Sequence, residues 1–223
     1  MSIKAEKNLK DSELYEECFG YKESRSTLRF YVIILLFVIA VLLFRLYFTS
    51  TYGGVEVDGM SMYATLEHKD KLLMRYVEDG EGLERGDVIV VDVRKYPECK
   101  NVGSGFLIKR LIAIEGDKVK CIKGQLYIQY AGEQMWTAIN EEAMGYTPRY
   151  INKSAYNFDT YIVGEGEIFF LGDNRDNSCD SRYKEKNHTG SHLKNSLYKA
   201  TDVHGVVPEW AIENRDTIEK FFF

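Results

Sequence analysis

The chain reads Phe106-Leu107-Ile108-Lys109-Arg110-Leu111-Ile112-Ala113-Ile114 over the stretch that decides its fold. Short runs of this kind, rich in apolar and β-branched residues, are typical of β-strands. Side chains alternate between the two faces of a strand, so Lys109 and Arg110 point to opposite faces. Either one of the two cations points into a buried layer, or the strand lies at a sheet edge, where charged residues deter aggregation.

Similar short runs lie on both sides of this stretch, at residues 87–93 (DVIVVDV), 118–122 and 167–171. Turn signals separate them, with glycine at positions 86, 116, 124, 164 and 166. The spacing is that of consecutive strands rather than of strands alternating with helices. The sequence therefore predicts a mostly β domain.

An apolar run, FYVIILLFVIAVLLF, occupies residues 30–44, resumes after Arg45 and ends at Phe48. As a helix, these residues extend about 28 Å, close to the ~30 Å hydrocarbon core of a bilayer. A cleavable secretory signal has a shorter apolar region followed by an A-x-A-like site, which is missing here. The run is predicted to be an uncleaved transmembrane anchor.

The charges beside this run predict its orientation. Cations at positions 22, 25 and 29 crowd its amino-terminal flank, whereas no Lys or Arg follows Arg45 until Lys69. By the positive-inside rule, the amino-terminal flank lies in the cytoplasm. The predicted division is a cytoplasmic segment (1–29), an anchor in the cell membrane (30–49) and an extracytoplasmic domain (50–223).

The composition excludes several classes of protein. Lys and Arg number 29 against 34 Asp and Glu, a net charge of -5 without the basic excess of a nucleic-acid-binding protein. The four cysteines form no CxxC pair, and the sequence leaves open a disulfide between Cys99 and Cys121. His188 and His192 lie four apart, but Gly190 separates them and no acidic ligand has zinc-peptidase spacing. No metal site is predicted.

A polar run, GDNRDNSCDSR, follows the strand at residues 167–171 and occupies residues 172–182. A calcium-binding loop needs glycine at its sixth position and glutamate at its twelfth. Counted from Asp173, those positions hold Ser178 and Lys184, so the calcium interpretation fails.

Ser61 lies in the segment GMSMYATL at residues 59–66. A serine close to a glycine is more often a turn former than a nucleophile. A lysine whose pKa is lowered by desolvation from about 10.4 toward 7 or 8 is able to take the serine proton, which makes a pair of Ser61 and Lys109 chemically feasible. A Ser/His arrangement using His68 or His204 would explain fewer residues of the chain.

In order and spacing, these segments resemble the bacterial type I signal peptidase family, and the resemblance covers residues 30 to about 207. Its most specific part is GDNRDNSCDSR. The segment around Ser61 resembles the family's nucleophile box, RGDVIVV at residues 85–91 resembles its next strand, and Lys109-Arg110 followed by Gly116-Asp117 resembles the box of the general base. The resemblance implies a mostly β, signal-peptidase-like fold with one transmembrane helix and a small inserted subdomain at about residues 118–165.

The resemblance also implies roles for individual residues. Ser61 would attack the scissile carbonyl, and Lys109 would act as general base without a cofactor or metal. Ser178 would orient the lysine amine. The remaining implied contributions are an ion pair of Asp180 with Arg182 that braces the polar run, an oxyanion contact from the Ser61 N–H beside the hydroxyl-free Gly59, and substrate binding by Met62.

The implied substrates are secreted preproteins, cut after small residues in A-x-A-like sites at the lipid bilayer, with the secretion machinery as a further partner. Two residues depart from the family, because Ala64 and Glu115 stand where its members usually have proline. The first predicts a looser serine segment, and the second places an anion near Lys109. The alternative functions are a non-cleaving assembly factor for surface structures such as pili, and a self-cleaving repressor, which the membrane segment disfavours.

Overall fold

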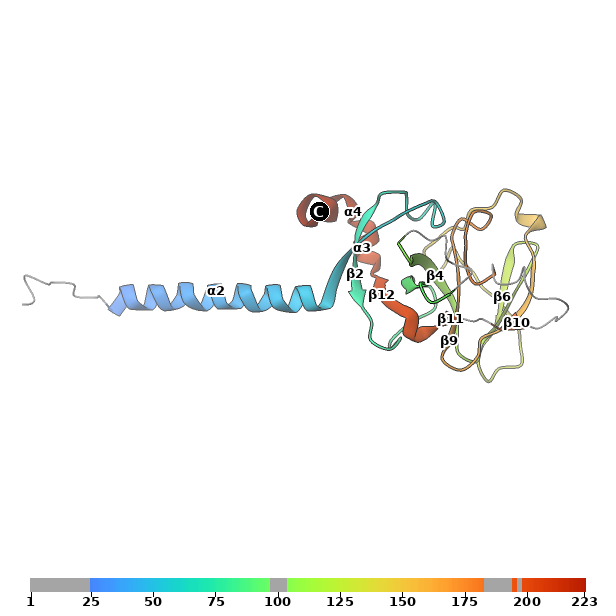
Figure 1. The fold of residues 1–223 in the computed structure, drawn as a ribbon, viewed down its shortest axis with the longest axis horizontal. Coiled ribbons are helices and arrows are strands. Elements are labelled where there is room, and N and C mark those ends of the chain that lie inside the picture. The colour runs from blue at the N-terminus through green and yellow to red at the C-terminus, as the bar shows by residue number, and fades with distance from the viewer. Residues whose placement is uncertain (1–24, 97–103, 183–193, 196–197) are drawn as a thin grey trace, which may run out of the picture. The chain divides into compact units, whose positions relative to one another are not determined.

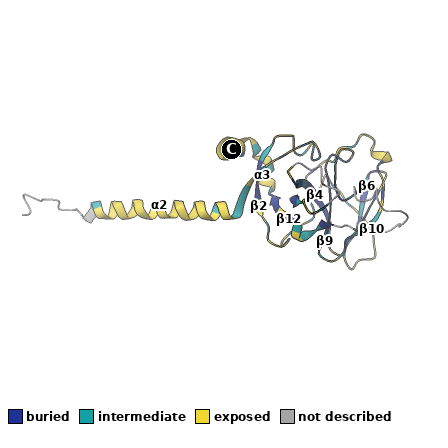
Figure 2. Ribbon diagram, viewed as in Figure 1, coloured by how far each residue is buried: buried dark blue, intermediate teal, exposed yellow. Residues whose placement is uncertain are grey.

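The structure is a computed structural model that describes residues 25–96, 104–182, 194–195 and 198–223. It divides into two compact units, residues Met1–Thr49 and Ser50–Phe223. The described part of the first unit is helical, and helix α2 runs over Arg25–Thr51. Its apolar side chains are exposed on all sides (Figure 2). By length and composition, α2 is a candidate to cross a membrane.

The larger unit is built on a seven-stranded sheet whose neighbouring strands are all antiparallel (Figure 1). In spatial order its strands are β1 (Tyr52–Glu56), β2 (Lys71–Tyr76), β12 (Val203–Val207), β3 (Val88–Asp92), β4 (Phe106–Ile114), β9 (Glu167–Leu171) and β11 (Tyr198–Lys199). Strand β4 lies in the interior of the sheet, whereas β1 lies at one edge.

A five-stranded sheet forms the rest of this unit. Its spatial order is β10 (Lys194–Asn195), β8 (Phe158–Ile162), β5 (Lys118–Ile122), β6 (Gln125–Gln129) and β7 (Thr137–Ala138). Short helices complete the described chain, namely the 3-10 turns η2 (Lys153–Ala155) and η4 (Ala200–Asp202) and the α-helices α3 (Glu209–Glu213) and α4 (Arg215–Phe222). The mostly β fold expected from the sequence is confirmed.

Strand β9 joins two apolar cores. Phe169 packs with the aromatic side chains of the five-stranded sheet, including Phe158 and Tyr161. Its neighbour Phe170 points the other way and packs against Tyr198. Because both faces of β9 are buried, the strand fixes the start of the polar run that follows Leu171.

The predicted strand at residues 106–114 is confirmed with the same bounds, but its setting differs from the expectation. β4 pairs with β3 on one side and β9 on the other, so the sheet-edge interpretation is wrong. Lys109 and Arg110 are both buried, although only one was expected to be. The physical reason is that each face of this interior strand is covered, and each cation has hydrogen-bonding partners there.

Of the two cysteines between which the sequence leaves a disulfide open, the structure describes only Cys121. Cys121 is buried, and its thiol lies 3.6 Å from the Tyr156 carbonyl oxygen. Burial raises the pKa of this thiol to about 11. Cys99 lies outside the described residues, and so do His188 and His192.

Candidate active site

Ser61 lies in the segment that connects β1 to β2, here called the serine loop (residues 57–70). Its two ends are tied together, since the Val57 N–H donates to the Asp70 carbonyl at 2.9 Å and the Lys69 N–H donates to the Val57 carbonyl at 2.8 Å. The side chains of Met62 and Leu66 are buried and hold the loop against the domain. The hydrogen bonds at its ends and the two buried side chains thus fix the serine loop, and with it the position of Ser61.

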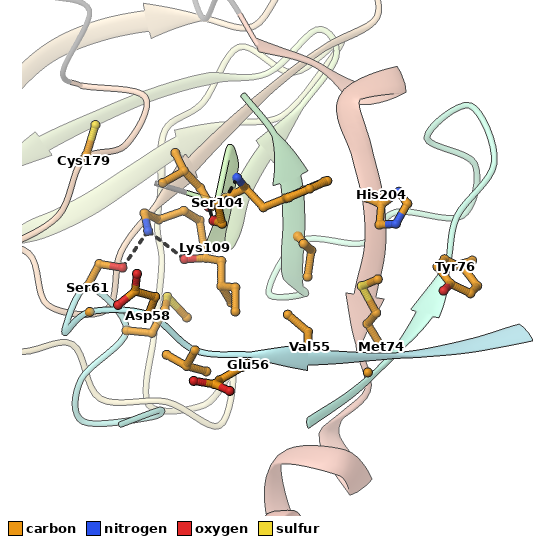
Figure 3. A pocket seen from close by; sticks show the side chains of 18 residues that line it. Val55, Glu56, Asp58, Ser61, Met74, Tyr76, Ser104, Lys109, Cys179 and His204 are labelled. Carbon is orange, nitrogen blue, oxygen red and sulfur yellow. Dashed lines mark hydrogen bonds between the residues drawn. The ribbon is translucent and has the colours of Figure 1, made fainter. Parts of the chain in front are cut away.

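Lys109 reaches Ser61 from the interior of the seven-stranded sheet. Its Nζ lies 2.6 Å from Ser61 Oγ and donates to the Ile108 carbonyl at 2.7 Å (Figure 3). The lysine is only 1% exposed. At this distance the amine is within hydrogen-bond reach of the hydroxyl, as a base and its nucleophile must be.

The polar run at residues 172–182, here called the polar loop, holds the serine loop from behind. The Asn174 N–H donates to the Ser61 carbonyl at 3.0 Å, and Asn174 Nδ2 donates to the Met60 carbonyl at 3.0 Å. Thr65 Oγ1 donates to Asp173 Oδ2 at 2.5 Å. These bonds fix the backbone on both sides of the serine side chain.

Arg110 ties β4 to the same loop on the face opposite Lys109. Its guanidinium donates two hydrogen bonds to the buried carboxylate of Asp173, at 2.9 and 2.6 Å, and one to the Gly86 carbonyl at 2.7 Å. It also stacks on Tyr146, 3.8 Å from the ring centre. Two-pronged pairs of this kind set orientation as well as distance.

Asp180 and Arg182 form a second buried ion pair, with Arg182 Nε 2.7 Å from Asp180 Oδ1. Burial alone would raise the pKa of Asp180, but the Arg182 charge and the hydrogen bonds to the carboxylate outweigh it, so this pKa is lowered. One of these bonds comes from the Gly172 N–H at 3.1 Å. Through these contacts, Asp180 ties the end of the polar loop to its first residue, Gly172.

Ser178 lies close to the backbone of Ser61. A methyl group at Gly172 would stand 2.2 Å from Ser178 Oγ and 2.5 Å from the Ser61 carbonyl oxygen, so both atoms crowd the same point. The Ser178 hydroxyl helps to lower the pKa of Asp180, yet its geometry falls short of a full hydrogen bond to any described residue. It is a buried hydroxyl with spare hydrogen-bonding capacity.

A segment of the intervening chain, residues 141–150 and here called the bracing segment, completes the support. Arg175 of the polar loop is buried and pairs with Glu141. The Arg149 N–H donates to the Asp173 carbonyl at 2.8 Å, and its carbonyl accepts from the Arg175 N–H at 3.0 Å. The Arg149 guanidinium stands 5.0 Å from the centre of the Tyr63 ring in the serine loop.

A cavity of about 640 Å³ opens beside the Ser61 hydroxyl. Its walls include residues 54–59 on one side and residues 106–109 on the other. Figure 3 shows Ser61 and Lys109 at one end and His204 with Tyr76 at the other. His204 contacts Tyr76 edge to face, with ring centres 5.4 Å apart. The lining thus runs from the Ser61 hydroxyl to this pair of rings.

The predicted site residues fall into two groups. Ser61, Lys109, Gly59 and Met62 line the cavity, whereas Ser178, Asp180 and Arg182 of the polar loop do not. The sequence interpretation assigned no role to several residues that belong to this site, namely Asp58, Thr65, Glu141, Arg149 and Asn174. His204, considered only as an alternative partner of Ser61, lines the far end of the cavity. The described residues contain no group of three or more His, Cys, Asp or Glu side chains arranged to hold a metal ion.

Two further details refine the sequence expectations. The Gly59 N–H donates to His68 Nδ1 at 3.1 Å, so it is already engaged, whereas the Ser61 N–H has no acceptor among the described residues. The Glu115 carboxylate is exposed and accepts a hydrogen bond from the Gly166 N–H at 2.8 Å. This carboxylate therefore stabilises the turn that contains Gly166.

Comparison with known proteins places this geometry in context. The protein family described as signal peptidase, peptidase S26, matches residues 27–216. Signal peptidase I U of Bacillus subtilis is 32% identical over 157 residues, which cover 68% of this chain and 75% of the relative. Signal peptidase I of Bacillus licheniformis is 34% identical over 160 residues, which cover 67% and 74%.

A solved structure is also similar, a signal peptidase I from Enterococcus faecalis V583. It is 24% identical with a TM-score of 0.39, and the match covers 57% of this chain and 98% of that chain.

Proposed function

The chain belongs to the signal peptidase family, peptidase S26, and is a serine peptidase that removes signal peptides; from this premise we propose that Ser61 is its nucleophile and Lys109 its general base. The observation that carries the proposal is the 2.6 Å separation of Lys109 Nζ from Ser61 Oγ inside a buried site. A nucleophile within hydrogen-bond reach of its base is the geometry that activated serines need.

In the proposed reaction, the neutral Lys109 amine takes the proton of the Ser61 hydroxyl as the oxygen attacks the scissile carbonyl. The tetrahedral oxyanion accepts a hydrogen bond from the Ser61 N–H. The ammonium then gives its proton to the leaving amine, which leaves an acyl-enzyme. Water, deprotonated by the same amine, attacks the ester and releases the acid and the regenerated serine.

Ser178 is proposed to orient the amine during these steps. Its hydroxyl is buried close to Ser61 and has spare hydrogen-bonding capacity. The ion pair of Asp180 with Arg182 is proposed to hold the polar loop in place, so that these two residues act through Ser178 and Asn174. Such supporting contacts hold a catalytic group in its productive orientation.

The substrate is proposed to be the cleavage region of a preprotein, bound in extended form along the cavity. Strand β1 is an edge strand, and residues 54–56 face the cavity with their outer edge unpaired by the seven-stranded sheet. A peptide is able to add to such an edge as a further strand. Gly59 and the buried Met62 near Ser61 leave a shallow apolar space that suits small residues of A-x-A type.

Helix α2 is proposed to anchor the chain in the cell membrane with residues 1–29 in the cytoplasm and residues 50–223 outside. The cations near its amino-terminal end support this orientation. A signal peptide also arrives in the membrane, so an anchored peptidase meets its cleavage site at the bilayer surface.

The test is cleavage of a purified preprotein with an A-x-A site by the full chain in detergent. Ser61→Ala and Lys109→Met are expected to remove detectable cleavage, because loss of a catalytic nucleophile or base costs about 10⁴-fold or more. Ser178→Ala is expected to lower kcat by about 100-fold. EDTA is expected to have no effect.

Ser104→Ala is the matched control, because Ser104 also lines the cavity but its hydroxyl bonds to the Phe106 backbone, at 3.3 Å. It should cleave at the native rate, and thermal unfolding should show that every variant is folded. Cleavage that survives in Ser61→Ala would refute the assignment. A native chain that binds several preproteins without cutting them would favour the assembly-factor function instead.

A further inference from the structure

Three hydrogen bonds between described residues join the two limbs of the serine loop, and the one closest to Ser61 in the chain ends on a histidine ring. The outer two are backbone bonds, from the Val57 N–H to the Asp70 carbonyl and from the Lys69 N–H to the Val57 carbonyl. The third runs from the Gly59 N–H to His68 Nδ1, at 3.1 Å. Of these three bonds, it is the one whose acceptor titrates.

Gly59 is a point of the serine loop where such a restraint matters. Its φ of +97° is a backbone conformation that glycine adopts easily, but glycine also has the widest range of alternative conformations. Downstream of it, Asn174 fixes the carbonyl groups of Met60 and Ser61. Upstream, the bond to His68 fixes the Gly59 amide, two residues before the Ser61 N–H that is proposed to bind the oxyanion.

The direction of this bond fixes the protonation state of the His68 ring. A backbone N–H can only donate, so Nδ1 presents its lone pair to Gly59, and the imidazole is neutral with its proton on Nε2. Protonation of Nδ1 would point an N–H group at the Gly59 N–H and break the bond. Neutral His68 thus holds Gly59, and the imidazolium does not.

The carboxylate of Asp58 is a second partner for the same nitrogen. Asp58 Oδ1 lies 3.6 Å from His68 Nδ1, close enough for an ion pair once that nitrogen carries a proton. Figure 3 shows Asp58 at the Ser61 end of the cavity, which Gly59 also lines. The two protonation states of one ring nitrogen therefore favour two different partners, and both partners belong to the wall of the cavity.

The other charged groups near the imidazole, on the same loop and the end of β1, are Glu56, Glu67, Lys69 and Asp70. Glu56 pairs with Lys69 at 2.8 Å, and its pKa is lowered, first by Lys69 and last by His68. Asp70 Oδ2 accepts from the Glu67 N–H at 2.8 Å. Asp58 is therefore the carboxylate placed to pair with the ring, which is 45% exposed and exchanges protons with water directly.

We propose that His68 is a positioning residue of the active site, whose neutral imidazole holds Gly59 and with it the backbone turn that presents the Ser61 N–H. Protonation moves Nδ1 from Gly59 to Asp58 and leaves this turn unrestrained on its upstream side. Cleavage at acidic pH is then limited by His68 as well as by protonation of Lys109. The inference rests on the proposed function, because stabilisation of the oxyanion by the Ser61 N–H is part of it.

Preprotein cleavage by the full chain in detergent tests the positioning role with three variants. His68→Leu removes the acceptor and should lower kcat about 10-fold at pH 8 with little change in KM, because small misplacements of reacting groups are costly. His68→Asn carries an amide oxygen at the position of Nδ1 and cannot titrate, so it should recover most of the native rate. Glu67→Gln removes an exposed charge beside His68 and is the matched control, which should cleave at the native rate.

The pH profile separates His68 from Lys109. Both chains contain Lys109, so its protonation cancels in the ratio of native kcat to the kcat of His68→Asn. This ratio should be near one at pH 8 and should fall about 10-fold by pH 5.5, as the native imidazole gains its proton. A constant ratio, native kcat in His68→Leu, or a folded His68→Asn chain as slow as His68→Leu would overturn the proposal.

Nuclear magnetic resonance of the full chain observes the exchange of partners without catalysis. In the ¹⁵N-labelled Lys109→Met chain, the Gly59 amide proton should move to higher field as pH falls from 8 to 5, in step with the ring signals of His68. In the double variant with His68→Asn it should stay constant. A Gly59 signal that does not follow His68 would count against this inference alone, whereas a native chain that does not cleave preprotein would count against the proposed function.

Discussion

Lys109 and Arg110 are adjacent and both buried, yet their surroundings give them different chemistry. Arg110 faces the carboxylate of Asp173, which compensates the charge of the buried guanidinium. Lys109 Nζ lies 2.6 Å from the Ser61 hydroxyl and donates to the Ile108 carbonyl at 2.7 Å. The fold thus places one cation against a carboxylate and the other beside the hydroxyl from which it is proposed to take a proton.

The buried pair of Asp180 and Arg182 predicts how stability depends on pH. The pKa of Asp180 is lowered in the folded chain, so its stabilising effect is full above the usual carboxyl pKa of about 4 and is lost as pH falls through the lower folded value. Asp180→Asn should lower the free energy of unfolding by about 3 kcal/mol at pH 7 and flatten its dependence on pH below about 4.

Urea unfolding of the native and variant chains at pH 7 and at pH 3 measures both effects. Asp159→Asn is the control, because that carboxylate is exposed on β8. Equal stability of the native chain and Asp180→Asn at pH 7 would contradict the prediction.

At the scale of residues, the pairing of Ser61 with Lys109 was predicted from a resemblance to a known pair, and the structure places the two side chains 2.6 Å apart. The role of Asn174 could not be predicted from the sequence, because its hydrogen bonds to the serine loop join segments more than 100 residues apart in the chain. His204 was set aside because a Ser/Lys pair explained more residues of the chain than a Ser/His pair, and its place in the cavity follows from the position of β12 in the sheet. Contacts of this kind arise from strand pairing, which single-sequence patterns do not specify.

At the scale of elements, the exit of β9 into the polar loop is the tightest point of the site. A side chain at Gly172 would overlap Ser178 Oγ and the Ser61 carbonyl oxygen. Gly172→Ala is therefore expected to displace the serine loop and to reduce kcat by about 100-fold with a smaller change in KM, because small misplacements of reacting groups are costly.

Preprotein cleavage kinetics test this expectation. Gly164→Ala is the matched control, because the nearest atom to its added methyl is the flexible end of Glu167, at 2.9 Å. It should leave kcat unchanged. Native kcat in Gly172→Ala would show that the loop tolerates displacement.

The individual strands were predicted better than their arrangement. Strands β4, β5 and β9 have the bounds expected from their apolar runs. β1 contains Gly53 and Gly54 and gave no strand signal. The insertion of β12 between β2 and β3 joins the end of the chain to its middle, and local propensity carries no information about such pairing.

At the scale of the whole molecule, residues 50–223 form a compact unit with its own apolar core. A chain reduced to these residues is expected to fold cooperatively and to cleave a short soluble A-x-A peptide at the native rate. Its rate on a bilayer-embedded preprotein should fall by about 100-fold, because the membrane no longer concentrates enzyme and substrate together.

Parallel assays on both substrates, with circular dichroism of the shortened chain, measure this prediction. Equal loss on the two substrates would mean that residues 1–49 are needed for the site itself. The sequence was informative at this scale about the apolar helix and the charges beside it, because membrane insertion depends on composition.

The path between β4 and β9 bears on the evolutionary history of the chain. Ile114 and Ile168 are paired neighbours, so the excursion that carries β5, β6, β7 and β8 begins and ends at one place in the main sheet, where a simple hairpin would suffice. Deleting it would nevertheless remove Glu141 and leave the buried Arg175 without its carboxylate, at a cost of about 3–5 kcal/mol. A lineage that shortened this excursion would first have had to replace Arg175. The length of the excursion and the residue at position 175 are therefore expected to change together in evolution.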